Sequence, residues 1–147
     1  MYRAGRWLRH YVSIEQVTNL VRAKAAASPA VARTLLIDVR STAEVARTGL
    51  IPTAVNIPLP ILQDALDPDG AIDDDAFEAA FGVARPEPAR SDLIFYCAHG
   101  IRSATAADVA ERLGYARTYN FAGSWAQWYH TYGGDEADDP TKDTPQP

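Results

Sequence analysis

The feature that most constrains the fold is a short apolar, aromatic-rich run at residues 93–97. It is too short for a core helix, and its unbroken apolar character is typical of a strand buried in a parallel sheet. A glycine-containing loop follows, and Ser103 then opens a helix-favouring segment that Gly114 ends. A strand, a tight loop and a helix in this order predict an α/β domain with Cys97 at the carboxyl end of a strand.

Further strands and helices are predicted on both sides of this unit. Strands are expected at 11–12 and 34–40, with one more inside 50–58. A turn and a last short strand are expected within 114–120. Ser13 and Gln16 have the spacing of a capping box, which predicts a helix that ends before Pro29. Shorter helices are expected at 41–48, near 60–62, at 73–81 and within 121–129.

Cys97 is the candidate nucleophile. A free thiol has a pKa near 8.5, and the unpaired N–H groups at the start of a helix favour the thiolate. Arg102 adds a positive charge if its side chain folds back over the loop. The alternative interpretation is that Cys97 is a small buried hydrophobic residue, as most free cysteines are.

A second polar group follows the strand expected at 34–40. Asp38 and Arg40 break that strand near its carboxyl end, and Glu44 follows in a short helix. These three residues are best interpreted as a structural ion-pair and capping cluster beside the Cys97 loop, and a direct catalytic role for them is the minority interpretation. The acidic run 73–75 lacks the spacing of a calcium loop and is interpreted as a helix start.

Composition narrows the function classes. The chain has 147 residues, a net charge of −5 and one cysteine. The negative net charge does not indicate nucleic-acid binding. One cysteine excludes an internal disulfide and a cysteine-based zinc site. We expect no metal and no cofactor. No apolar run has the length of a membrane span and no signal-peptide block is visible, so a cytoplasmic location without membrane partners is expected.

Three motifs resemble the signatures of the rhodanese family of sulfurtransferases. Residues 38–58 resemble its amino-terminal signature, residues 97–103 its C-x-x-G-x-R-S loop, and residues 119–125 its carboxyl-terminal signature. The three occur in the order and at the separation of one rhodanese domain. We therefore expect an arm at 1–7, a rhodanese-like domain at 8–132 and a flexible acidic, proline-rich tail at 133–147.

The chain departs from the family pattern at three positions outside the nucleophile and its loop. Leu50 stands where histidine is common, Thr53 where glycine is common, and Ala122 replaces the first glycine of a pair. These departures concern local packing more than chemistry.

The resemblance implies a rhodanese-like α/β fold, with a five-stranded, mostly parallel sheet and helices on both faces. It also implies sulfur transfer: the Cys97 thiolate takes the outer sulfur of a donor such as thiosulfate and passes it from a persulfide to cyanide or a thiol. The expected thiol is a low-molecular-weight compound or a thioredoxin-like protein. Arg102 is expected to bind the anionic donor.

The loop between Cys97 and the helix is expected to hold the persulfide sulfur through its N–H groups. His99 either adds a proton or donor, or simply faces solvent. Ser103 is expected to be the helix N-cap rather than a catalyst. The loop residues predicted at the site are Ala98, His99, Gly100, Ile101 and Ser103.

Two other functions stay open. Cysteine phosphatases and arsenate reductases use a related anion loop, but only four residues separate Cys97 from Arg102 here, one fewer than in the phosphatases. The shorter loop suits a single sulfur atom better than a tetrahedral phosphate. The third possibility is a protein-binding module or persulfide carrier with little turnover on small molecules.

Overall fold

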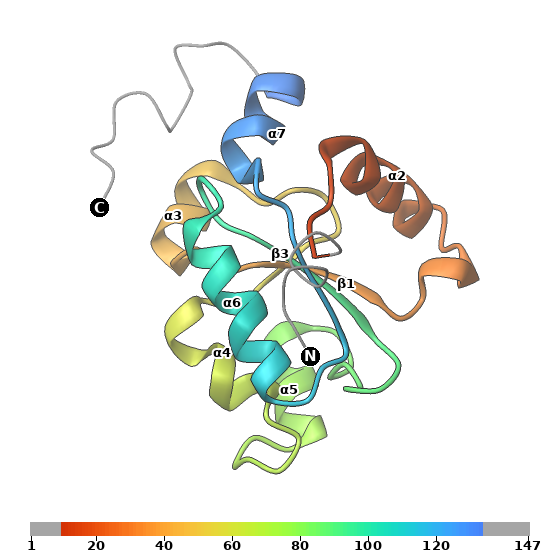
Figure 1. Cartoon of the computed structure of the whole chain (residues 1–147), viewed down its shortest axis with the longest axis vertical. Helices are drawn as coiled ribbons and strands as arrows, with labels where there is room; N and C mark the ends of the chain where they lie inside the picture. The colour runs from red at the N-terminus through yellow and green to blue at the C-terminus, as the bar shows by residue number, and fades with distance from the viewer. Residues whose placement is uncertain (1–9, 134–147) are drawn as a thin grey trace.

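A parallel sheet in the order β2-β1-β3-β4 forms the middle layer of the computed structural model (Figure 1). Its strands are β1 (Thr34–Asp38), β2 (Val55–Asn56), β3 (Asp92–Tyr96) and β4 (Arg117–Asn120). All three pairings are parallel. The structure describes residues 10–133, so the predicted arm 1–7 and the predicted tail, apart from Gly133, lie outside the described residues.

Helices cover both faces of the sheet, as the resemblance implies. One face carries α2 (Ile14–Ala25) and α7 (Ser124–Tyr132), and the other carries α4 (Leu59–Leu66), α5 (Asp74–Phe81) and α6 (Ile101–Arg112). The shorter elements are α3 (Thr42–Thr48) and the 3-10 turn η1 (Pro29–Val31). Among the described residues, no helix combines the length and apolar character needed to cross a bilayer.

The sheet of the described residues has four strands, so the expectation of five is wrong. Tyr11 lies beside β4, but it forms only an isolated parallel bridge with Asn120. The Val12 N–H donates to the Asn120 carbonyl at 3.1 Å, and the Asn120 N–H donates to the His10 carbonyl at 2.7 Å. Because Ser13 is already the N-cap of α2, the chain turns into a helix before this pairing extends into a strand.

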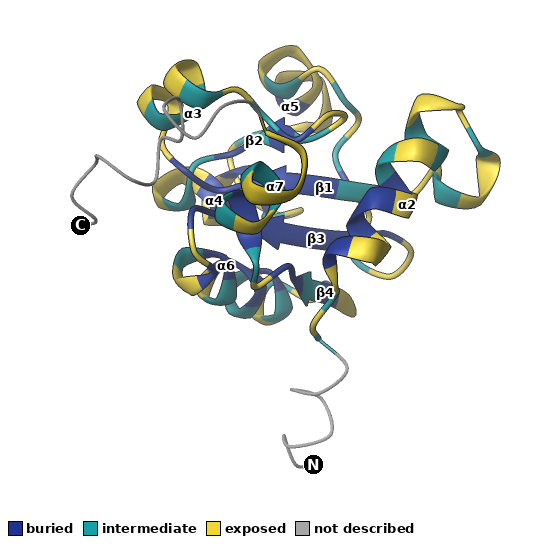
Figure 2. Ribbon diagram, turned by 90° about the horizontal axis from the view of Figure 1, so that it is seen from above, coloured by how far each residue is buried: buried dark blue, intermediate teal, exposed yellow. Residues whose placement is uncertain are grey.

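Two apolar clusters lie on opposite faces of the sheet because side chains alternate along each strand. On β3, Leu93 and Phe95 point to the cluster under α4, α5 and α6, and Cys97 continues this series. Ile94 and Tyr96 point to the cluster under α2 and α7. Figure 2 shows β1 and β3 coloured as buried along most of their length. The buried run predicted from the sequence is therefore a central strand.

Side-chain caps start three of the helices. Ser13 and Gln16 form the predicted capping box of α2, and Ser41 and Glu44 form another at α3. Asp73 accepts a hydrogen bond from the Ala76 N–H at 2.8 Å, so the acidic run 73–75 is a helix start as predicted. Each such cap stabilises a helix by about 1 kcal/mol.

Thr53 adopts an unfavourable backbone conformation. Its φ is +74°, in the left-handed region that glycine tolerates and β-branched residues rarely enter. This is one of the positions where the family commonly has glycine. The substitution therefore leaves local backbone strain of about 1–2 kcal/mol in the turn before β2.

Candidate active site

Cys97 directly follows the last residue of β3 and lies beneath the start of α6. Its exposed fraction is 1%. Gly100 turns the chain from the cysteine into the helix with a φ of +96°, and it is the N-cap of α6. A Cβ atom at this position would overlap the Ala122 carbonyl group, so close packing as well as conformation requires glycine.

Ser103 is not the helix N-cap that the sequence predicts. Because Gly100 admits the left-handed turn, α6 begins at Ile101, and Ser103 falls in its first turn. The Ser103 side chain is fully buried, and its Oγ lies 3.4 Å from Cys97 Sγ. The hydroxyl that was expected to cap the helix therefore contacts the candidate nucleophile.

Hydrogen-bond donors converge on the sulfur of Cys97. The Gly100 N–H donates to Sγ at 3.0 Å. Burial raises the pKa of the thiol, but the Ser103 hydroxyl and the N–H groups of Ser103, Gly100 and His99 lower it by more. The net effect is a pKa below the ordinary value. This arrangement stabilises an anion on the sulfur at the positive end of α6.

The end of β4 and the start of α7 hold the cysteine loop in place. The Cys97 N–H donates to Ser124 Oγ at 3.2 Å, and the Cys97 carbonyl accepts from the Trp125 N–H at 2.9 Å. Asn120 Nδ2 donates to the Gly100 carbonyl at 3.2 Å. The sequence analysis did not single out Ser124, although the carboxyl-terminal motif that contains it marks this segment.

Arg102 forms a bidentate ion pair across the mouth of the site. Its Nη1 and Nη2 lie 2.8 Å and 3.0 Å from the two carboxylate oxygens of Glu44. These hydrogen bonds hold the Glu44 pKa at about 2, below its usual 4.5. The pKa of Arg102 is raised mainly by its hydrogen bonds to Glu44, with a further electrostatic contribution from Cys97. Arg102 is thus near enough to the thiolate to interact with it.

Asp38 and Arg40 form a second ion pair, which is almost completely buried. Arg40 Nη2 lies 2.7 Å from an Asp38 carboxylate oxygen, and the exposed fractions of the two side chains are 2% and 0%. The Arg40 guanidinium lies 4.8 Å from the Trp125 ring centroid and donates to the Thr48 hydroxyl and the Gly49 carbonyl. The pair therefore ties β1 to the turn after α3 and to α7.

The remaining loop residues differ in exposure. Ala98 is buried, whereas His99 is exposed, and the Ile101 side chain is 80% exposed. The structure thus places the N–H of His99 toward the sulfur and leaves its imidazole at the surface. Within residues 10–133, no group of three or more histidine, cysteine or acidic side chains has the arrangement of a metal site.

A buried thiol with a lowered pKa, facing the first turn of a helix in a parallel α/β domain, defines a cysteine-dependent anion loop. The family model of the rhodanese-like domain matches residues 17–131. The protein belongs to the rhodanese-like domain family.

Similar proteins carry sulfurtransferase names. A Homo sapiens thiosulfate:glutathione sulfurtransferase is 38% identical over 96 residues, which cover 65% of this chain and 79% of that protein. A putative mitochondrial thiosulfate sulfurtransferase of Schizosaccharomyces pombe is 35% identical over 95 residues, covering 65% of this chain and 63% of that protein. The structure of a human single-domain sulfurtransferase matches with a TM-score of 0.69 at 32% identity, covering 83% of this chain and 96% of that one.

Proposed function

We propose that this protein is a thiosulfate-type sulfurtransferase in which Cys97 carries the transferred sulfur. The observation that carries the proposal is the set of donors on Cys97 Sγ, namely the Gly100 N–H at 3.0 Å and the Ser103 hydroxyl at 3.4 Å. The family and the names of its similar members support the same reaction class.

In the first half-reaction, the Cys97 thiolate attacks the outer sulfur of thiosulfate. A new S–S bond forms at Cys97, the S–S bond of thiosulfate breaks, and sulfite leaves with the electron pair of that bond. Two negative charges enter with thiosulfate and two leave with sulfite, so no proton has to move. The charge of the thiolate ends on the outer sulfur of the persulfide. We assign its stabilisation to the N–H groups of the loop between Cys97 and Ser103, because the Gly100 N–H already donates to the adjacent Cys97 Sγ.

In this proposal Arg102 binds the sulfonate end of the donor. Its guanidinium is oriented by two hydrogen bonds to Glu44, whose carboxylate offsets the single positive charge of Arg102. An incoming dianion competes with Glu44 for the same N–H groups. The proposed role of Glu44 is therefore positional: it keeps Arg102 extended across the loop until the donor arrives.

In the second half-reaction, a thiolate attacks the outer sulfur of the Cys97 persulfide. The acceptor gains that sulfur, and Cys97 leaves as a thiolate that is stabilised by the same donors. The proposed acceptor is a low-molecular-weight thiol such as glutathione, or a thioredoxin-like protein. Because the cycle passes through a covalent intermediate, it is of the ping-pong type.

The length of the loop favours this reaction over phosphate ester hydrolysis. Four residues separate Cys97 from Arg102, one fewer than in the cysteine phosphatases. The shorter loop suits a single sulfur atom better than a tetrahedral phosphate. We also propose that residues 8–132 form the catalytic unit and that the protein is cytoplasmic.

Steady-state kinetics distinguish an enzyme from a persulfide carrier. We expect sulfite release with thiosulfate and glutathione as co-substrates, and parallel double-reciprocal plots when both are varied. Intersecting plots would contradict the covalent intermediate. Stoichiometric loading of sulfur without sustained sulfite release would identify a carrier, and release of inorganic phosphate from an aryl phosphate would favour a phosphatase instead.

A further inference from the structure

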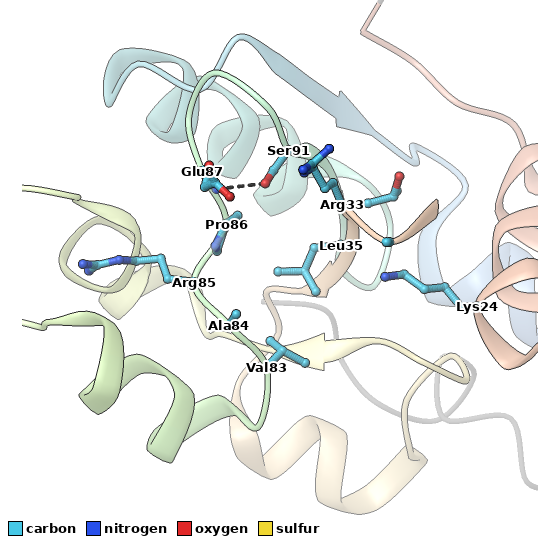
Figure 3. A pocket seen from close by; sticks show the side chains of 11 residues that line it. Lys24, Arg33, Leu35, Val83, Ala84, Arg85, Pro86, Glu87 and Ser91 are labelled. Carbon is cyan, nitrogen blue, oxygen red and sulfur yellow. Dashed lines mark hydrogen bonds between the residues drawn. The ribbon is translucent and has the colours of Figure 1, made fainter. Parts of the chain in front are cut away.

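A pocket lies at the amino-terminal ends of β1 and β3, whereas Cys97 lies at the carboxyl end of β3. It has a volume of about 230 Å³, and Figure 3 shows the side chains that line it. Thr34 and Leu35, at the start of β1, and Ser91, immediately before β3, form part of its lining. Ser91 lies six residues before Cys97 along β3, which corresponds to roughly 20 Å at about 3.3 Å per residue. The pocket is therefore distinct from the sulfur-transfer site.

Two cationic side chains of this pocket have no anionic partner among the residues that the structure describes. Lys24 comes from the last turn of α2, and Arg33 directly precedes β1. Within residues 10–133, neither side chain has a hydrogen bond or an ion pair. Lys24 is partly buried, so its ammonium group has lost part of its hydration, and this burial lowers its pKa. An anion in the pocket would replace the hydration that Lys24 has lost.

The other charged residues of the pocket do not neutralise this pair. The Arg85 guanidinium is bound to Asp74, with Nη2 2.8 Å from the carboxylate oxygen, and to the carbonyls of Asp67 and Ile72. The Glu87 carboxylate lies 3.8 Å from Arg90 in an exposed pair. Lys24 and Arg33 thus give the pocket an uncompensated positive charge in a chain whose net charge is −5.

A buried hydroxyl and an apolar wall complete the pocket. Ser91 is 5% exposed, and its Oγ accepts a hydrogen bond from the Glu87 N–H at 2.8 Å. In the part of the chain that the structure describes, no acceptor receives the Ser91 hydroxyl proton. Leu35, Val83 and Pro86 supply apolar surface beside these polar groups. A ligand that satisfies all of them has an oxyanion at one end and an apolar body.

We propose that this pocket binds a small organic anion with a carboxylate or phosphate group. Lys24 and Arg33 pair with the oxyanion, Ser91 donates its free proton to it, and the apolar part of the ligand lies on Leu35, Val83 and Pro86. The proposal does not depend on the reaction at Cys97. Carboxylate and phosphate share the chemistry of this pocket, and separate probes distinguish them.

The test is an NMR titration of the full-length protein at constant ionic strength with inorganic phosphate, phenyl phosphate and benzoate. We expect saturable shifts of the Leu35 and Ser91 amide signals, with a dissociation constant at or below about 1 mM for at least one organic probe. Phenyl phosphate is expected to bind more tightly than inorganic phosphate because the apolar wall contributes. The preferred oxyanion is that of the organic probe, phenyl phosphate or benzoate, that binds with the lower dissociation constant.

The variant pair K24A/R33A is expected to weaken binding about tenfold or more, since each cation provides a charge-assisted hydrogen bond. The control pair R22A/R47A removes the same charge at exposed positions outside the pocket and is expected to leave the affinity unchanged. No saturable shift with any probe, equal affinity in the two double variants, or shifts confined to the Cys97 loop would each overturn the proposal.

Discussion

Replacing Ser103 by alanine removes the only side-chain hydrogen-bond donor that contacts Cys97 Sγ among the described residues. The change deletes one buried oxygen atom and leaves the N–H donors of the loop and the first turn of α6 in place. It therefore tests whether the hydroxyl stabilises the thiolate. Alanine favours a helix at least as strongly as serine, so α6 is expected to persist.

A hydrogen bond to a charged group contributes about 1.5–3 kcal/mol. The 3.4 Å separation between Ser103 Oγ and Cys97 Sγ is long for an oxygen acceptor and ordinary for sulfur, so we take the lower end of this range. About 1.4 kcal/mol corresponds to a factor of ten in an equilibrium constant. The ratio of thiolate to thiol at a fixed pH is therefore expected to fall about tenfold in S103A.

The assay is the rate of Cys97 alkylation by iodoacetamide as a function of pH. The inflection is expected to move to higher pH in S103A, because the thiolate is the reacting form. T105A, at an exposed position of the same helix, is the matched control and is expected to keep the wild-type profile. An unchanged profile in a folded S103A protein would refute the reasoning and leave the backbone N–H groups as the sole cause of the lowered pKa.

Three further changes test other parts of the account. R102A is expected to raise the KM for thiosulfate about tenfold while thermal unfolding shows an intact fold, and unchanged kinetics would remove Arg102 from the site. In the wild type, the lowered Glu44 pKa of about 2 contributes to the free energy of unfolding. This contribution is fully present above pH 4.5 and is lost as the pH falls toward 2. E44Q is therefore expected to be less stable at pH 7 by up to about 1 kcal/mol and to lose less stability below pH 4.5, as measured by urea unfolding. T53G is expected to raise the unfolding free energy by about 1 kcal/mol because it relieves a φ of +74°; a lower value would show that the turn is not strained.

Sequence reasoning located the strand, the loop and the helix around Cys97 because each has a local signal. The apolar run at 93–97, the glycine and the alanine-rich helix segment all depend on residues close together in the chain. The capping box at Ser13 is equally local. This local unit also identified Cys97 as the candidate nucleophile, and the family motifs then added the helices on both faces of the sheet and the sulfur-transfer reaction.

The features that sequence reasoning missed depend on contacts between distant segments or on the conformation of one residue. The position of Ser103 against Cys97 follows from the left-handed φ of Gly100, because α6 then begins at Ile101 and Ser103 lies inside its first turn. The contact of Ser124 with the Cys97 N–H joins two segments that are far apart in sequence. The strand predicted at 11–12 does not form, because the helix N-cap at Ser13 ends the pairing after one bridge at Tyr11.

The most direct test of sulfur transfer through Cys97 is the intact mass of the protein before and after incubation with thiosulfate. Wild-type protein is expected to gain the mass of one sulfur atom and to lose it again when glutathione or cyanide is added. C97S is expected to gain nothing. A wild-type protein that gains no sulfur while Cys97 still reacts with iodoacetamide, or a C97S protein that is loaded and discharged as the wild type is, would contradict the account.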